Sequence, residues 1–370
     1  MKQITVMSIF GTRPEAIKMA PVIHELECYP ETIRSIVVST AQHREMVDSI
    51  IDTFHLTPAY DLNVMTANQD FATVIYSVMS RLAAILQHEQ VDFMLVQGDT
   101  TTTFAASLTG FYHKIPVGHV EAGLRTHHMY YPFPEELNRA LTSRLASVHF
   151  APTPLAKANL LREGIPEQAI IVTGNTGIDA LLHIVTRQGA GAPEPGAGKR
   201  TILVTSHRRE NWGKPLEDIC LALLDIVDRF MDVEIVFPVH LNPNVQKTVR
   251  AILEGRQRIR LLDPLDYPRF CQWLAKSYLI LTDSGGIQEE APSLGKPVLV
   301  LRNETERPEG IIAGTSRLVG TDRDAIVRET GMLLEKPDEY RKMAHIANPF
   351  GDGKAGKRIV QHILQRGLAN

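Results

Sequence analysis

The sequence predicts an α/β protein with two doubly wound, Rossmann-like domains that face each other across a cleft. Short apolar runs of strand length alternate with longer segments of helical period, which is typical of a parallel sheet built from βαβ units. A second series of this kind begins after a Gly-, Pro- and Ala-rich stretch at residues 189–198. A chain of 370 residues is also long enough for two domains, each with its own core.

The expected strands are short apolar runs, and the expected helices lie between them. We expect strands at residues 4–10, 35–39, 93–97, 116–120, 148–151 and 170–173 in the first half, and at 201–205, 233–239, 259–262, 279–282 and 297–301 in the second. Between residues 74 and 86, apolar side chains such as Val74, Val78 and Leu82 recur on one helical face. This pattern favours a helix that packs on a sheet.

The crossing between the halves is expected near residues 173–176. The first domain then comprises residues 1–173 and is completed by a C-terminal helix at 356–370, and the second domain comprises residues 174–355. Residues 189–198 are expected to form a flexible surface loop in the second domain.

The composition is that of an ordinary globular enzyme and excludes several other classes. A net charge of −3 argues against a nucleic-acid partner. Three cysteines, Cys28, Cys220 and Cys271, make an odd number without metal-like spacing, which argues against a disulfide framework. No stretch approaches the roughly 20 apolar residues of a membrane helix, so we expect no membrane contact and a cytoplasmic location. His127 and His128 have no third ligand at a suitable spacing, so we expect no metal and no cofactor.

Two loops follow strands and have the character of phosphate sites, because open parallel sheets bind ligands at the carboxyl ends of their strands. Gly11-Thr12-Arg13-Pro14-Glu15 follows the first strand, and Pro14 suits the first turn of a helix whose free N–H groups attract phosphate. Arg13 and Lys18 add positive charge there. The alternative is a plain strand-to-helix turn.

The second loop, Asp283-Ser284-Gly285-Gly286, joins a strand to a helix in the second half. Its two glycines allow the backbone to approach a diphosphate closely. Glu290, about one turn further on, is suited to accept hydrogen bonds from ribose hydroxyls. The alternative is that the glycines serve only helix–sheet packing.

Acidic residues follow two neighbouring strands of the first half. Asp99 and Glu121 are expected at the cleft edge, where carboxylates beside a diphosphate make sense if they move protons or hold sugar hydroxyls. The alternative for Asp99 is to cap the helix that begins near Thr100. Glu135 opens another helix, with Arg139 one turn further on the same face, and the alternative for Glu135 is a helix-dipole partner.

Basic residues follow the first strand of the second half. His207, Arg208 and Arg209 are expected at the cleft, where His207 is suited to protonate or hydrogen-bond a leaving phosphate. Arg302, Arg307 and the loop at residues 351–354 add polar groups to that half, with solvated surface as the alternative for each.

Taken together, these motifs resemble those of the non-hydrolysing UDP-N-acetylglucosamine (UDP-GlcNAc) 2-epimerases over nearly the whole chain. The matching segments, in the family's order and approximate spacing, are Gly11–Glu15, Gln97–Thr100, His119–Arg125, Pro134–Glu136, His207–Glu210 and Asp283–Gly286. The resemblance implies the two-domain GT-B architecture and a homodimer.

The resemblance also implies a reaction and a set of site residues. The reaction removes the C2 proton, breaks the C1–O bond to give 2-acetamidoglucal and UDP, and re-adds UDP with C2 inverted. This would supply precursors of bacterial cell-surface polysaccharides. By the resemblance, the catalytic candidates are Asp99, Glu121, Glu135 and His207, and the substrate-binding candidates are Arg13, Lys18, Arg139, Phe270, Ser284, Gly285, Gly286, Glu290 and Arg307.

Bacterial members also bind a second UDP-GlcNAc as an activator, and Gln42, His43, Arg208 and His240 match that pocket. The chain departs from the family pattern at Glu45, where we expect Gln, and at Asn68, where we expect Arg. Ser206 also stands where a smaller residue is usual.

Three other functions share parts of this pattern. A hydrolysing epimerase would release free N-acetylmannosamine and UDP, and a GT-B glycosyltransferase would consume the UDP-sugar only with an acceptor. A non-catalytic UDP-sugar-binding regulator would keep its function after alanine replaced Asp99 or Glu121.

Overall fold

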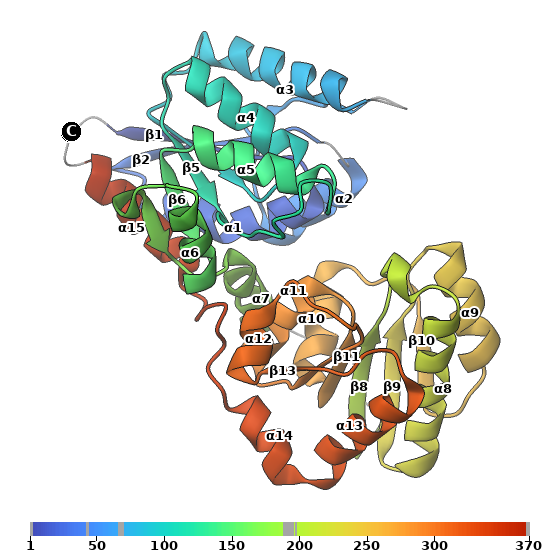
Figure 1. Cartoon of the computed structure of the whole chain (residues 1–370). Coiled ribbons are helices and arrows are strands. Elements are labelled where there is room, and N and C mark those ends of the chain that lie inside the picture. The colour runs from blue at the N-terminus through green and yellow to red at the C-terminus, as the bar shows by residue number, and fades with distance from the viewer. Residues whose placement is uncertain (1–2, 42–43, 66–69, 188–195, 197, 368–370) are drawn as a thin grey trace. The chain divides into compact units, whose positions relative to one another are not determined.

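The computed structural model describes residues 3–41, 44–65, 70–187, 196 and 198–367, without the side chain of Glu45. The predicted loop at 189–198 therefore lies almost entirely outside the described residues. The chain divides into two compact units, Met1–Ala180 with Gly351–Asn370, and Leu181–Phe350 (Figure 1). The unit boundaries thus lie somewhat away from the expected residues 173 and 356.

The first unit is a parallel sheet of seven described strands in the order β3-β2-β1-β4-β5-β6-β7. Its strands are β1 (Ile4–Phe10), β2 (Ile33–Ser39), β3 (Tyr60–Asp61), β4 (Phe93–Gln97), β5 (Val117–Val120), β6 (Val148–Ala151) and β7 (Ile170–Val172). Its helices are α1 (Arg13–Glu27), α2 (Arg44–Phe54), α3 (Phe71–Leu86), α4 (Thr101–Tyr112), α5 (Glu135–Leu145), α6 (Pro154–Arg162) and α15 (Ala355–Gly367), with a 3-10 turn η1 (Glu167–Ala169).

Helix α3 illustrates how the apolar pattern becomes packing. Val74, Val78 and Leu82 are buried in one cluster with residues of β1, β2 and β4. Asp70 caps the helix, because its carboxylate accepts a hydrogen bond from the Thr73 N–H at 2.7 Å. The predicted amphipathic helix is confirmed and begins three residues earlier than its apolar stripe.

The second unit is a parallel sheet of six described strands in the order β10-β9-β8-β11-β12-β13. Its strands are β8 (Arg200–Thr205), β9 (Val233–Pro238), β10 (Ile259–Leu262), β11 (Leu279–Thr282), β12 (Val298–Val300) and β13 (Ser316–Leu318). Its helices are α8 (Lys214–Arg229), α9 (Pro243–Leu253), α10 (Tyr267–Lys276), α11 (Gly285–Glu290), α12 (Pro308–Ala313), α13 (Arg323–Glu335) and α14 (Pro337–Ala344), with 3-10 turns η2 (Arg209–Asn211) and η3 (Ala291–Leu294).

The predicted fold class, two doubly wound α/β halves, is confirmed unit by unit. Two strands were not predicted, and both are at sheet edges: β3 has two residues and β13 has three. Runs this short carry no alternating apolar pattern, so only pairing with a longer neighbour reveals them. None of the helices formed by the described residues is both long and apolar enough to cross a membrane.

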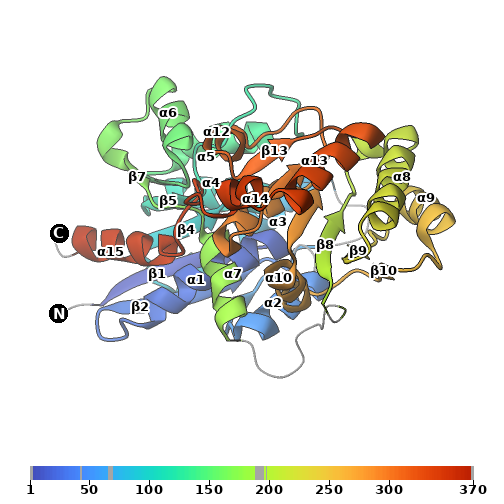
Figure 2. The same ribbon diagram turned by 90° about the horizontal axis from the view of Figure 1, so that it is seen from below.

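The chain leaves and re-enters the first unit at one place. Helix α7 (Thr176–Thr186) carries the chain out, and the Asp179 carboxylate accepts a hydrogen bond from the Gly356 N–H at 2.9 Å. Gly351 has a φ of 144°, and a Cβ there would lie 3.2 Å from the Asn175 nitrogen. Helix α15 then packs against α1 (Figure 2).

Candidate active site

Asp99 lies in the turn between β4 and α4. Gly98 makes this turn with a φ of 77°, a conformation that favours glycine. The helix cap is Thr100, whose hydroxyl accepts a hydrogen bond from the Thr103 N–H at 3.2 Å. The alternative role of Asp99 as the helix cap is therefore wrong, and its carboxylate is available for another purpose.

Arg139 of α5 forms an ion pair with the Asp99 carboxylate. Its Nη2 and Nε lie 2.6 Å and 2.9 Å from the Asp99 Oδ2 atom, and its Nη1 lies 3.1 Å from Glu136 Oε2. The Asn138 amide donates to the Asp99 backbone carbonyl at 2.9 Å. Burial acts to lower the pKa of Arg139, but Asp99 and Glu136 outweigh it and raise the pKa. One helix thus fixes both the backbone and the side chain of Asp99.

Glu121 directly follows β5 and has a left-handed backbone with a φ of 66°. For a residue with a side chain, this conformation is uncommon and is often found at functional sites. Its carboxylate is mostly buried and forms an ion pair with Lys18 of α1. The structure therefore brings together a predicted acid/base residue and a predicted diphosphate contact.

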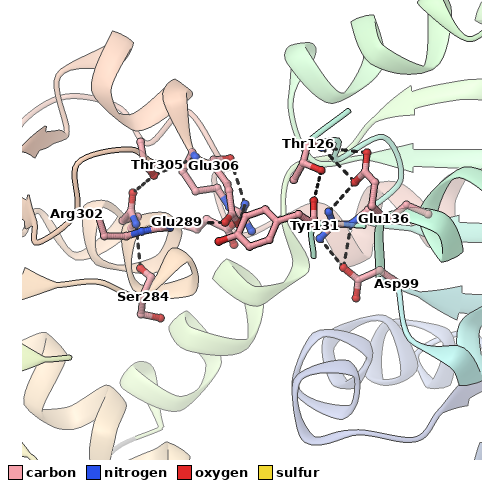
Figure 3. A network of polar contacts seen from close by, with 12 residues as sticks. Asp99, Thr126, Tyr131, Glu136, Ser284, Glu289, Arg302, Thr305 and Glu306 are labelled. Atoms are coloured by element: carbon pink, nitrogen blue, oxygen red, sulfur yellow. Dashed lines mark hydrogen bonds and ion pairs between the residues drawn. The ribbon is translucent and has the colours of Figure 1, made fainter. Parts of the chain in front are cut away.

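The two glutamates at the start of α5 have different environments. Glu136 is only 5% exposed and accepts hydrogen bonds from the Thr126 and His127 N–H groups, at 3.1 Å and 2.9 Å. It therefore anchors the loop before the helix (Figure 3). Glu135, the predicted acid/base residue, is the first residue of α5 and is half-buried.

Glu15 is a buried residue of the loop after β1 that the sequence did not predict as part of the site. It is 2% exposed and accepts hydrogen bonds from the Gly11 and Thr12 N–H groups at 3.0 Å and 2.7 Å. The Thr100 and Thr103 hydroxyls donate to its other oxygen at 2.6 Å and 3.0 Å. Burial raises the pKa of Glu15, while these bonds oppose the rise.

Glu15 thus ties the loop after β1 to the turn that carries Asp99. The spacing of Thr12 and Glu15 is that of a capping box, which was the available signal. Arg13, the first residue of α1, is exposed beside this loop.

In the second unit, Asp283 organises the loop after β8. Its carboxylate is fully buried, and Oδ2 accepts hydrogen bonds from the His207 and Arg208 N–H groups at 2.8 Å and 3.0 Å. The Ser206 hydroxyl and the Asn211 amide donate to the same oxygen at 2.9 Å and 3.0 Å. A residue known from the sequence only as part of a loop motif is therefore the anchor of the predicted catalytic histidine.

His207 also faces Asp283 through its ring, with 3.2 Å between Nδ1 and Asp283 Oδ1. The ring stacks on His240, with 5.6 Å between centroids and 23° between planes. Burial lowers the pKa of His207, and the nearby Arg208 and His240 lower it further. The Asp283 carboxylate acts in the opposite direction and raises it. Burial therefore favours the neutral ring.

Two guanidinium groups lie at the start of α11. A Cβ placed on Gly285 would lie 3.7 Å from the Arg307 Nη2 and 3.9 Å from the Arg208 Nη2. Gly286 is exposed, and a Cβ there would have nothing within 4 Å. Ser284 is the N-cap residue. The backbone at this point is open and flanked by positive charge, which suits a diphosphate.

Buried acidic and amide groups hold the loop after β12, which carries Arg302 and Arg307. The Arg307 guanidinium forms an ion pair with Glu289, and the backbone N–H of Arg307 donates to the Thr305 hydroxyl at 3.1 Å. That hydroxyl donates to the Gln288 amide oxygen at 2.7 Å. Arg302 is 6% exposed and pairs with Glu210 at 2.6 Å. The solvated-surface alternative is therefore wrong for Arg302.

Glu290 is the last residue of α11 and lies near α10, the helix that carries Phe270. Phe270 is half-buried on α10. Burial, and after it the charge of Glu290, raises the pKa of Tyr267 and of Cys271, which both lie on α10. Glu290 thus lies within electrostatic reach of the helix that carries the predicted uracil contact.

The residues matched to a second ligand pocket are only partly described. Gln42, His43 and Asn68, and the side chain of Glu45, lie outside the described residues. Arg208 and His240 lie beside His207, as described above. The loop at 351–354, which we assigned to the second half, lies in the first unit, where Asp352 pairs with Arg358 at 2.7 Å.

This chain is similar over nearly its whole length to known proteins of one family. The family model described as UDP-N-acetylglucosamine 2-epimerase matches residues 26–364. The UDP-N-acetylglucosamine 2-epimerase of Bacillus subtilis is 52% identical over 366 residues, which cover 98% of this chain and 96% of the relative. The Escherichia coli K12 protein of the same name is 50% identical, with coverage of 96% and 97%.

A solved structure is equally similar. The crystal structure of the Neisseria meningitidis UDP-GlcNAc 2-epimerase bound to UDP-GlcNAc has a TM-score of 0.89 and 49% identity, and the match covers 98% of this chain and 100% of that one. The family resemblance expected from the motifs is therefore confirmed. The chain belongs to the UDP-N-acetylglucosamine 2-epimerase family and is an enzyme of the isomerase class.

Proposed function

We propose that the protein interconverts UDP-GlcNAc and UDP-N-acetylmannosamine without hydrolysis. UDP is eliminated to give 2-acetamidoglucal and is then re-added with C2 inverted. The observation that carries this proposal is the pair of carboxylates after β4 and β5. Asp99 and Glu121 follow adjacent strands, and each is oriented by its own cation, Arg139 and Lys18.

Two such carboxylates suit the chemistry. A C2 proton is a weak acid and is lost more easily as UDP departs and positive charge develops at C1. Inversion needs proton transfer at both faces of C2, and therefore two positions for an acid/base group. Asp99 and Glu121 are the candidates, and Glu135 is a third.

We assign the UDP moiety to residues of the second unit. Ser284, Gly285 and Gly286 are assigned to the diphosphate, which suits the open backbone at Gly286 and the Arg307 guanidinium beside Gly285. Glu290 is assigned to the ribose and Phe270 to the uracil, following the family resemblance. Arg13, Lys18 and Arg139 of the first unit complete the proposed substrate-binding set.

His207 is assigned to the leaving phosphate. Because its Nδ1 faces a carboxylate, the ring has Nε2 left for the substrate. A bound diphosphate adds negative charge, which favours the protonated ring and opposes the effect of burial. The protonated ring can then donate to the phosphate oxygen as the C1–O bond breaks.

Further properties follow from the same family assignment. We propose a cytoplasmic enzyme that supplies cell-surface polysaccharide precursors and acts as a homodimer, with a second UDP-GlcNAc bound by Gln42, His43, Arg208 and His240. The dimer is supported by large exposed side chains on the neighbouring helices α3 and α4, among them Tyr76 at 71%, Phe111 at 57% and Tyr112 at 67% exposure.

Proton NMR in deuterated water tests the reaction directly. Purified protein is incubated with UDP-GlcNAc and no acceptor, and the C2 and anomeric signals are followed. Formation of UDP-N-acetylmannosamine with deuterium at C2 is the expected result. Free N-acetylmannosamine with stoichiometric UDP would instead establish hydrolysis, and an unchanged spectrum would point to a transferase or to a different sugar.

A further inference from the structure

His119 is a buried histidine on β5 that the reaction above does not use. Its ring is fully buried, and Nε2 lies 2.7 Å from the backbone carbonyl oxygen of Gly98. A carbonyl oxygen can only accept, so the ring proton is on Nε2. The other nitrogen, Nδ1, is buried without a hydrogen-bond partner in the described part of the chain. Packing alone would be served better by an apolar side chain, so the Gly98 bond is the contribution specific to histidine.

That bond completes a clamp on the turn before Asp99. The Gly98 N–H donates to the Val120 carbonyl at 3.0 Å, while the Gly98 carbonyl accepts from His119. Both backbone groups of Gly98 are therefore held by consecutive residues of β5. The next residue along β5 is Glu121. A single segment of three residues thus restrains one proposed acid/base group and carries the other.

We propose that His119 is a positioning residue that sets the separation of the Asp99 and Glu121 carboxylates by holding the Gly98 carbonyl. It acts through the turn and does not touch the substrate. The proposal rests on the acid/base roles proposed above for these two carboxylates. Because small displacements of catalytic groups are costly, the bond matters for turnover rather than for binding.

The ring is neutral when it does this. Burial lowers the pKa of His119 to about 3, and the nearby Arg125, Arg139 and His149 act in the same direction. The Gly98 carbonyl raises the pKa but does not outweigh burial. His119 therefore keeps its hydrogen bond unchanged across the pH range in which the enzyme would be assayed, and it adds no limb to the pH profile.

Three variants test the proposal, with thermal unfolding to verify that each is folded. His119→Phe fills the site without a donor, His119→Gln can place an amide N–H near the Nε2 position, and His149→Phe is the matched control. His149 is 1% exposed on β6 and lies directly opposite His119 in the sheet register. His149→Phe makes the same exchange of an imidazole for a phenyl ring, whereas the Gly98 N–H and carbonyl bond to Val120 and His119.

We expect His119→Phe to lower kcat by about 10- to 100-fold with KM for UDP-GlcNAc changed less than about threefold. His119→Gln should recover most of the loss, all pH profiles should keep the wild-type shape, and His149→Phe should keep the wild-type kcat. An unchanged kcat in His119→Phe, an equal loss in His149→Phe, or no recovery in His119→Gln would overturn the proposal. Asp99→Asn is measured alongside, and wild-type activity in that variant would instead refute the acid/base role proposed for Asp99.

A measurement on the wild-type protein does not depend on the folding of the Phe variant. In the ¹⁵N NMR spectrum of histidine-labelled protein, the signals of His119 are those that disappear in His119→Gln. They should report a neutral ring with the proton on Nε2 and no titration between pH 5 and 8.5. A proton on Nδ1, or titration in that range, would contradict the proposed hydrogen bond.

Discussion

Arg139 contacts Asp99 through two nitrogens, at 2.6 Å and 2.9 Å, and both contacts are with the same carboxylate oxygen, Oδ2. The second oxygen, Oδ1, lies outside this ion pair. A carboxylate held in this way has a fixed direction and one oxygen for a proton of the substrate. The bond geometry therefore suits proton transfer better than a fork with one nitrogen on each oxygen would.

Asp99→Asn should lower kcat by about 10²- to 10⁴-fold, the usual contribution of a positioned acid/base group, with a small change in KM. The matched control is Glu89→Gln. Glu89 pairs with Arg34 at 2.7 Å, before β4 and therefore at the opposite end of the sheet. Steady-state kinetics should distinguish the two, and a similar loss in Glu89→Gln would show that the effect is not specific to the site.

Glu121→Gln should impair turnover to a similar degree, but it should affect the opposite face of C2. In deuterated water, each variant should still exchange the C2 proton of one of the two UDP-sugars, because the base for that face remains. Asp99→Asn and Glu121→Gln should therefore show opposite patterns when the reaction is started from each sugar. If both variants lose exchange from the same sugar, the two carboxylates do not serve different faces.

Asp283→Asn should shift the titration of His207 to lower pH. The Asp283 carboxylate acts to raise the pKa of His207 against burial, so its neutralisation removes that support. The amide also cannot accept all the bonds that Oδ2 receives, so thermal stability and kcat should fall together. Ser206→Ala is the control, because it removes one neutral donor and keeps the carboxylate. An unchanged His207 titration by NMR would contradict the prediction.

His149 should make the first unit sensitive to acid. Burial lowers the pKa of His149 in the folded protein to about 4, from its ordinary value of 6.5. As the pH falls below 6.5, the unfolded chain binds the proton first. The contribution of the neutral His149 to the free energy of unfolding is therefore fully present above that pH and is lost as the pH falls toward 4. At about 1.4 kcal/mol per pKa unit, wild type should lose about 2 kcal/mol more than His149→Phe between pH 7 and pH 5.

Urea unfolding of both proteins at the two pH values measures this difference. Asp179, whose pKa burial raises to about 6, has the opposite influence, because its folded form binds the proton more readily than its unfolded form. Its contribution is common to both proteins and cancels in the comparison. Equal losses in wild type and His149→Phe would rule out His149 as the source.

The sequence predicted most of the fold because long apolar runs dominate it. The expected bounds of β1, β4, β6, β10 and β11 coincide with the observed ones. The edge strands β3 and β13 were not predicted from the sequence, because their few residues form strands only through hydrogen bonds to a neighbouring strand.

Within the site, the sequence predicted residue types at strand ends but not the bonds between them. Asp99 and Glu121 were identified because they follow adjacent strands. Arg139 was expected near Glu135 by helical spacing, yet it pairs with Asp99, 40 residues away in the sequence. Asp283 and Asn138, each within its own unit, contact residues 76 and 39 positions away in the sequence. Only tertiary packing creates such contacts.

The bond between Asp179 and Gly356 has a consequence for synthesis of the chain. Domains generally fold as they emerge from the ribosome, N-terminal first. Here the first unit lacks α15 until residues 355–367 are made, and Gly356 lies against the Pro21 carbonyl of α1. The second unit is therefore translated in full before the first can close. The domain begun first is the one finished last, and a prematurely terminated chain would leave α1 uncovered.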